Sequence, residues 1–381
     1  MTGIVVIGAG VIGASTAFRL AQGGALVTLL DATRAGGGTS LRSFAWLNAH
    51  NKQPRGYHAL NVAGMQAHVE LEKELGSMGW RHGGGCLEWT TDEAERGVQR
   101  ARADRLQGWG YSVSWISAPE ARALEPDLDP AALGDAPVAW YPDEGWMDPG
   151  VYIGVLLHRF AALGGRLLAG TQVSALLLRG GAVTGVRTAR GETIGADLVI
   201  NCTGGAVNTV TREQGLHVLM ASTFGLLAVT APAAVSLGRV IQGPGGLAMR
   251  PDGAGRVMLH SNQADLHLDG STQPDSGMPE ATEMAAQAAH LLTPLTAVPI
   301  EAVRIAVRPI PLDGHPVVGP ASGVDGYYLA VTHSGVTLAS WLGRAIAGEV
   351  LDGRPHPALA PFRPDRFARA GLVPQPMEGL A

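Results

Sequence analysis

Apolar residues at the start of the chain follow first a strand pattern and then a helix pattern. Residues 4–7 form a short apolar run, typical of a strand buried on both faces of a parallel sheet. From Ala14 to Ala21 the apolar residues recur at the spacing of one helix face, and a glycine pair follows where that helix would end. Residues 26–30 are again mostly apolar and lead to Asp31. The order strand, helix, strand predicts a right-handed βαβ unit.

The same two patterns predict further elements along the chain. Helices are expected at 57–75, 151–163, 280–292 and 338–351. Strands are expected at 87–90, 138–141, 166–178, 182–188, 198–201, 224–229, 256–260 and 327–331. The proline-rich end of the chain, after residue 353, is expected to form a loop or a strap on the surface.

Segments typical of a nucleotide-binding fold occur at the start, the middle and the end of the chain. They predict one discontinuous domain made of residues 1–80, 145–215 and 304–381. The segments between them, 81–144 and 216–303, have a different pattern and predict a mixed-sheet substrate-binding or cap domain. The predicted fold class is therefore α/β (α+β overall), with a Rossmann-like domain interleaved with a second one.

The composition describes a globular protein and narrows the classes of partner. The 381 residues are 46% hydrophobic and 16% charged, which suits two joined domains with large cores. The net charge of −5 argues against nucleic acid, and no stretch reaches the roughly 18 apolar residues of a membrane helix. Cys86 and Cys202 have no partners at metal-ligand spacing and form no disulfide framework, so no metal is expected. A cytoplasmic protein without membrane or nucleic-acid partners is predicted, and its oligomeric state is left open.

A glycine-rich turn joins the first strand to the first helix. It fits the pattern G-x-G-x-x-G, whose glycines permit a tight turn, close approach of phosphate and packing of the helix on the strand. The N–H groups that begin the helix would face the pyrophosphate, and the acidic residue about 20 positions later can accept the ribose hydroxyls. This context predicts a dinucleotide, although the turn alone serves both FAD and NAD. The residues expected to hold it are Gly8, Gly10, Val11, Ile12, Gly13, Asp31 and Ala32.

A second loop, residues 36–40, follows the second predicted strand. The longer flavin dinucleotide needs an additional phosphate-side loop in this place, so the loop favours FAD. Thr39, Ser40, Arg42 and Ser43 are expected to serve the cofactor there.

Four motifs together resemble the D-amino acid oxidase superfamily of FAD-dependent oxidoreductases, particularly its glycine oxidase and sarcosine oxidase branch. They are the nucleotide turn with its loop, G-W-M-D-P at 145–149, the stretch 173–205, and R-P-I-P-L-D-G-H-P-V-V-G at 308–319 with the following 326–338. The resemblance implies that Val173 meets the adenine, that Gly204 passes near the cofactor, and that the backbone of Ser334, Gly335, Val336 and Thr337 meets the flavin. It also implies non-covalent FAD, because the cysteine that some sarcosine oxidases attach to flavin is missing near residue 315.

Three residues are candidates for contact with the substrate. Arg308 could clamp a carboxylate with its planar guanidinium, or it could pair with Asp313 or a phosphate, and Arg304 is the alternative clamp. His333 could be a proton shuttle or a packing residue, and His50 is the third candidate for the pocket wall. The family's glycine before the histidine is Thr332 here, and no arginine follows closely. This departure leaves the binding of an amino-acid carboxylate open.

The resemblance implies oxidation of an amino acid or a small, secondary amine. The substrate would pass a hydride to flavin N5 and become an imine, and O₂ would then reoxidise FAD and give H₂O₂. Two alternatives stand beside this hypothesis. One is a dehydrogenase of the same fold that passes electrons to a quinone or a partner protein, and the other is a flavin-holding subunit without turnover.

Overall fold

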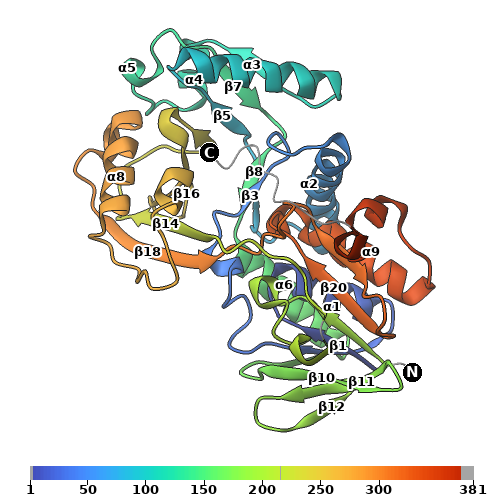
Figure 1. Cartoon of the computed structure of the whole chain (residues 1–381). Helices are drawn as coiled ribbons and strands as arrows, with labels where there is room; N and C mark the ends of the chain where they lie inside the picture. The colour runs from blue at the N-terminus through green and yellow to red at the C-terminus, as the bar shows by residue number, and fades with distance from the viewer. Residues whose placement is uncertain (1–2, 215, 370–381) are drawn as a thin grey trace.

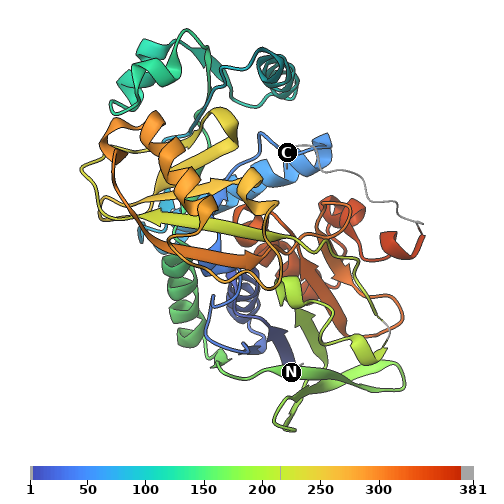
Figure 2. The same ribbon diagram turned by 60° about the vertical axis from the view of Figure 1, so that its left-hand side comes forward.

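A computed structural model describes residues 3–214 and 216–369 and contains two large β-sheets (Figure 1). Two smaller three-stranded sheets accompany them. One of these consists of β10, β11 and β12, which lie at the end of the molecule opposite helices α3–α5 in both views (Figure 2). No helix within the described ranges is long and apolar enough to cross a bilayer.

The first large sheet has six strands and is mostly parallel. Its order is β19-β20-β13-β1-β2-β9, and only β19 runs antiparallel to its neighbour. The strands are β1 (Gly3–Ile7), β2 (Leu26–Leu30), β9 (Arg166–Leu168), β13 (Leu198–Asn201), β19 (Val317–Pro320) and β20 (Tyr327–Val331). The helices that accompany it are α1 (Val11–Gln22), α2 (Arg55–Leu75), α6 (Pro149–Ala162) and α9 (Gly335–Asp352).

The second large sheet has eight strands and is mixed. Its order is β18-β14-β17-β16-β15-β5-β7-β6, and β15 runs parallel to β5. The strands are β5 (Cys86–Glu88), β6 (Ser114–Ile116), β7 (Val138–Tyr141), β14 (Phe224–Thr230), β15 (Val240–Gln242), β16 (Leu247–Pro251), β17 (Val257–Ser261) and β18 (Ile300–Val307). Its helices are α3 (Glu93–Gly108), α4 (Ala118–Leu124), α5 (Pro130–Leu133), α7 (Asn262–Asp265) and α8 (Pro279–Leu291).

The remaining elements are short or lie in the small sheets. They are β3 (Trp46–Leu47), β4 (Arg81–His82), β8 (Gly145–Met147), β10 (Val173–Arg179), β11 (Ala182–Thr188), β12 (Thr193–Gly195) and α10 (Arg366–Arg369). A short 3₁₀ turn at Pro357–Phe362 follows α9.

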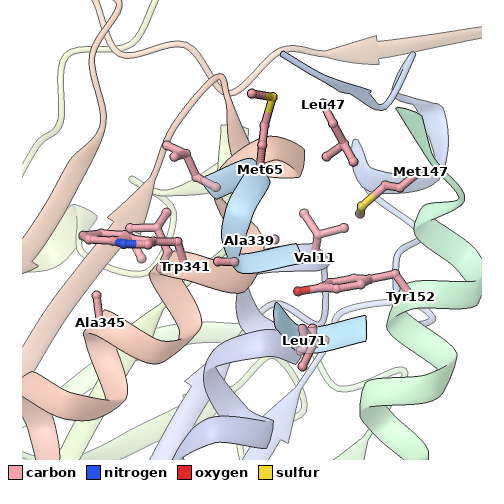
Figure 3. Packing of buried hydrophobic residues seen from close by; sticks show 14 of the residues in the cluster. Val11, Leu47, Met65, Leu71, Met147, Tyr152, Ala339, Trp341 and Ala345 are labelled. Carbon is pink, nitrogen blue, oxygen red and sulfur yellow. The ribbon is translucent and has the colours of Figure 1, made fainter. Parts of the chain in front are cut away.

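Close packing of α1, α2, α6 and α9 forms the core beneath the six-stranded sheet. Val11 from α1, Met65 from α2, Tyr152 from α6 and Ala339 from α9 lie together in it (Figure 3). Gly64 explains how α2 approaches the start of α9, since a Cβ atom there would lie 2.6 Å from the carbonyl oxygen of Thr337. The core therefore fixes the position of the α9 N-terminus.

The predicted fold class is confirmed, and most predicted elements are present. The strands at 26–30, 182–188, 198–201 and 327–331 have the predicted bounds. The helix predicted from residue 338 begins earlier, at Gly335, and the segment 166–178 is divided into two strands in different sheets. The predicted domain ranges stay a prediction. The chain after residue 353 contains helical turns before residue 370, beyond which the prediction lies outside the described residues.

Candidate active site

One large cavity lies between the two sheets. Its volume is about 780 Å³, and its wall combines the nucleotide turn, the start of α9 and strands of the eight-stranded sheet. The eight-stranded sheet contributes Gly225 and Leu227 from β14, Ala248 from β16 and His260 from β17. A molecule that filled this cavity would contact both halves of the protein.

The nucleotide turn is packed so tightly that glycine is required at two of its positions. Gly8 has φ +97°, and a Cβ atom on it would lie 2.5 Å from the carbonyl oxygen of Cys202. A Cβ atom on Gly13 would lie 1.8 Å from the carbonyl oxygen of Gly8. Gly8 and Gly10 line the cavity, whereas Gly13 lies beneath the turn and lets α1 pack against it.

Asp31 and Ser40 hold the turn from the side of β2. The carboxylate of Asp31 accepts hydrogen bonds from the N–H groups of Ala9 and Thr33, both at 2.9 Å. The Ser40 Oγ atom accepts a bond of 3.1 Å from the N–H of Val11, the first residue of α1. Asp31 and Ser40 also line the cavity, so both can contact a ligand as well as the turn.

The start of α9 forms the second helix N-terminus at the cavity. The Tyr57 hydroxyl is hydrogen-bonded to Ser334 Oγ at 2.7 Å, and Thr337 Oγ1 donates to the carbonyl oxygen of Trp46 at 3.0 Å. Thr332 Oγ1 accepts from the N–H of Ser334 at 3.2 Å, so this threonine supports the turn where the family pattern has glycine. The first N–H groups of a helix have no partner within it and carry partial positive charge.

The residues present fit an FAD molecule. A glycine cradle at one helix N-terminus suits a pyrophosphate, and the same cavity continues to a second helix N-terminus that suits a group that gains negative charge. The predicted cofactor residues that line the cavity are Gly8, Gly10, Val11, Ile12, Asp31, Thr39, Ser40, Arg42, Ser43, Gly204, Ser334, Gly335, Val336 and Thr337. Gly13, Ala32 and Val173 lie outside its wall.

Arg308 and His333, two of the predicted catalytic residues, line the cavity. Arg308 is held in a cluster: its Nη2 atom contacts Asp265 Oδ2 and His260 Nε2. The predicted alternative, an ion pair with Asp313, is not formed, because Asp313 pairs with Arg366 at 2.7 Å. Burial lowers the pKa of Arg308, and the Asp265 charge opposes that shift. 

His333 is held as a neutral imidazole. Burial lowers its pKa well below the ordinary histidine value, and the charges of Lys52, Arg308 and His260 act in the same direction. Burial also lowers the pKa of His260, although the neighbouring Asp265 carboxylate opposes this shift. Two uncharged imidazoles therefore face the cavity near neutral pH.

His50 and Arg304 are placed outside the cavity wall. His50 is 1% exposed, its Nδ1 atom lies 2.9 Å from the Glu144 carboxylate, and its ring stacks on Tyr141. Its ring also lies 5.1 Å, between centroids, from that of Trp46, which does line the cavity. Arg304 Nη2 lies 3.7 Å from Asp252 Oδ2. Neither residue is part of the cavity surface.

The sequence reasoning missed Lys52 and His260 among the cavity residues. Lys52 lines the cavity from the loop between β3 and α2. It is one of only two lysines in the sequence, the other being Lys73. The rarity of lysine in this sequence was a signal that could have drawn attention to Lys52. His260 lies on β17 in the part of the chain that carried no motif, so nothing local marked it.

Comparisons with known proteins show which family the chain resembles. The family model described as "FAD dependent oxidoreductase" (DAO) matches residues 3–349. An uncharacterised oxidoreductase of Bacillus subtilis is 25% identical over 96% of this chain and 99% of its own length. A glycine oxidase of Pseudomonas aeruginosa is 27% identical over 95% of this chain and 98% of its own length.

The fold is shared with solved structures as well. The crystal structure of L-proline dehydrogenase from P. horikoshii superposes with a TM-score of 0.84 and 20% identity. The match covers 98% of this chain and 99% of that one.

Proposed function

Because the chain belongs to the DAO family of FAD-dependent oxidoreductases, we propose that it oxidises the C–N bond of an amino acid or a small amine, secondary amines included, to an imine. The observation that carries this proposal is the single cavity that joins the nucleotide turn to Arg308, His333 and His260. FAD, when bound, supplies the electron acceptor for such an oxidation. The residues of the chain then have to bind, orient and desolvate the substrate.

The neutral imidazoles suit an amine substrate. His333 carries no charge near neutral pH, so it can accept a hydrogen bond from an amine N–H without repelling a cationic amine. His260 accepts from Arg308 and is held in place by it. The carboxylates in the described part of the wall, Asp31 and Asp313, are engaged by backbone N–H groups and by Arg366, so neither is free to hold an ammonium ion.

The names of the relatives support an amino acid or amine as the substrate. They leave two kinds of electron acceptor to compare. A glycine oxidase and an L-proline dehydrogenase are, by their names, enzymes that act on amino acids, one with a primary and one with a secondary amine. O₂, reduced to H₂O₂, is the acceptor we propose. The likeness to a dehydrogenase favours one alternative, in which a quinone or a partner protein takes the electrons.

Anaerobic mixing of the FAD-loaded protein with small amines tests the proposal. Glycine, sarcosine, L-proline and D-alanine form the panel, and glycolate, lactate and NADH are the controls. We expect loss of the flavin absorbance with at least one amine and with none of the controls. Reduction by the hydroxy acids or NADH alone would overturn the proposal. On admission of air, peroxide formed in step with substrate identifies O₂ as the acceptor, whereas reduced flavin that persists in air identifies the alternative.

A further inference from the structure

Basic side chains from four separate segments meet at the substrate end of the cavity. Lys52, His260, Arg308 and His333 all line its wall, and the charges of the first three all lower the pKa of His333. The carboxylates in the described part of the wall are engaged elsewhere. Asp31 is bonded to backbone N–H groups of the nucleotide turn, and Asp313 pairs with Arg366. This end of the cavity therefore attracts anions.

Arg308 is not the free cation of this group. Asp265 Oδ2 contacts its Nη2 atom, and the other oxygen of that carboxylate accepts the N–H of Leu226 at 2.7 Å. Only 15% of the Arg308 side chain and 9% of the Asp265 side chain are exposed. A Cβ atom on Gly225 would lie 2.7 Å from Arg308 Nε, so β14 leaves the guanidinium little room to move. Its charge is offset and its position is fixed.

Lys52 differs from Arg308 in both respects. Across residues 3–214 and 216–369 its ammonium group has no carboxylate within 4.0 Å and no hydrogen bond. The carboxylate whose charge acts on it most strongly is Glu144, but His50, Tyr111 and nearby backbone N–H groups already occupy the oxygens of Glu144. Burial lowers the pKa of Lys52 to about 8, so it is mostly protonated near neutral pH. Lys52 lines the cavity, and its three N–H donors have no partner in the part of the chain that the structure describes.

We infer that the Lys52 ammonium group binds the carboxylate of the substrate and that the Arg308–Asp265 pair forms the wall beside it. This inference rests on the proposed function, and it narrows the substrate class to amines that carry a carboxylate. It also reassigns the carboxylate-binding role from Arg308, the residue that the motif suggested, to a lysine outside the motif.

Carboxylate binding without turnover provides the test. Acetate and benzoate are titrated into the oxidised FAD-loaded protein, and the dissociation constant is read from the change in flavin absorbance. Lys52→Gln is expected to weaken binding about tenfold or more, because a charge-assisted hydrogen bond is lost. Lys52→Arg is expected to retain most of it, and Lys73→Gln, at the exposed second lysine, is the matched control and should bind as the wild type does.

A second measurement on the unaltered protein covers the case in which Lys52→Gln fails to fold or to hold FAD. Benzoate binding is expected to weaken as the pH rises from 7 through about 8, where Lys52 loses its proton. Of the groups around it, Arg308 stays charged, His260 and His333 are already neutral, Glu144 is already ionised, and burial raises the pKa of Tyr57. Affinity that is constant from pH 7 to pH 9 would point to Arg308 and overturn the inference.

The inference would also be overturned if wild type bound neither carboxylate, or if Lys52→Gln bound both as tightly as wild type. These titrations need no substrate turnover. Failure of every amine to bleach the flavin would defeat the proposed function and still leave the role of Lys52 decided by the titration.

Discussion

Asp31 and Asp197 are two carboxylates that accept backbone N–H groups at opposite ends of β1. Asp31 accepts from Ala9 at 2.9 Å and faces the cavity, whereas Asp197 accepts from Gly3 at 3.0 Å and lies away from it. Asp31→Asn is expected to weaken FAD binding about tenfold or more, because a charged acceptor for the ribose hydroxyls is lost. Asp197→Asn should leave the FAD dissociation constant within about twofold of wild type. Reconstitution of the apoprotein, followed by flavin fluorescence, measures both, and equal losses would contradict the assignment of Asp31.

The buried ammonium group of Lys52 is expected to lower the free energy of unfolding, although we propose that it binds the substrate carboxylate. Its pKa falls from 10.5 to about 8 in the folded chain, so below pH 8 the folded state carries a poorly solvated cation. This destabilisation is complete below the folded pKa and is relieved as the pH rises from about 8 towards 10.5. Lys52→Met should therefore raise the unfolding midpoint at pH 7 by at least ~3 °C, and by less at pH 9.5.

Thermal unfolding with excess FAD measures this change at both pH values. Lys73→Met serves as the control, because Lys73 is exposed on α2 and should show no shift at either pH. A Lys52→Met protein that melts below wild type at pH 7 would mean that the ammonium group has a stabilising partner.

At the scale of elements, α1 and α6 each contain a glycine, and the same substitution should act in opposite directions in them. In α1, a Cβ atom on Gly13 would meet the carbonyl oxygen of Gly8 at 1.8 Å, and neither backbone can move without opening the turn. Gly13→Ala is expected to lower the unfolding midpoint and to weaken FAD binding. In α6, Gly154 is exposed and has nothing within 4 Å, so Gly154→Ala should stabilise the protein by about 0.5–1 kcal/mol. Thermal unfolding and FAD titration measure the pair, and changes of the same sign would refute the packing argument.

Elements that are defined by local pattern were predictable, and elements that depend on distant partners were less so. The helix stripe from Ala14 to Ala21 and the apolar run of β2 both encode burial directly, and both were predicted. The start of α9 was placed too late, because glycine, valine and threonine at 335–337 are weak helix formers. Partners far away in the sequence, Tyr57 at Ser334 and the Trp46 carbonyl at Thr337, hold this turn in place.

At the scale of the whole molecule, the same limit applies to the site. The nucleotide turn is a local motif, so Gly8, Gly10 and Asp31 could be placed from the sequence. The surroundings of Lys52 could not, because Glu144 and Arg308 reach it from other parts of the chain. Long-range packing, and no local pattern, decides that Arg308 is paired with Asp265 and that Lys52 has no ion-pair partner among the described residues.

Glu144 joins segments that are far apart in the chain and is buried where they meet. Its side chain and that of His50 are both 0% exposed, and His50 Nδ1 lies 2.9 Å from the Glu144 carboxylate. The carboxylate also accepts from the N–H groups of Ala49 and His50 at 3.0 Å, from Tyr111 Oη at 2.8 Å and from Trp46 Nε1 at 3.1 Å. It thereby ties the loop that carries Lys52 to the turn between β7, a strand of the eight-stranded sheet, and β8.

Removal of this charge should therefore affect the whole fold. Burial alone would raise the pKa of Glu144, but the His50 charge and the hydrogen bonds hold it below 4.5. The stabilisation is present above the ordinary carboxyl range and is lost as the pH falls through the lowered pKa. Glu144→Gln is expected to reduce the free energy of unfolding by about 3 kcal/mol at pH 7, and by progressively less as the pH falls below 4.5.

The matched control is Glu74→Gln, which breaks the 2.7 Å pair with Arg19 at the surface and should change stability by less than about 1 kcal/mol. Chemical unfolding from pH 7 to pH 4 measures the free energy of unfolding of both variants. If Glu144→Gln lost as little stability as Glu74→Gln, the buried Glu144 carboxylate would not be what holds these segments together.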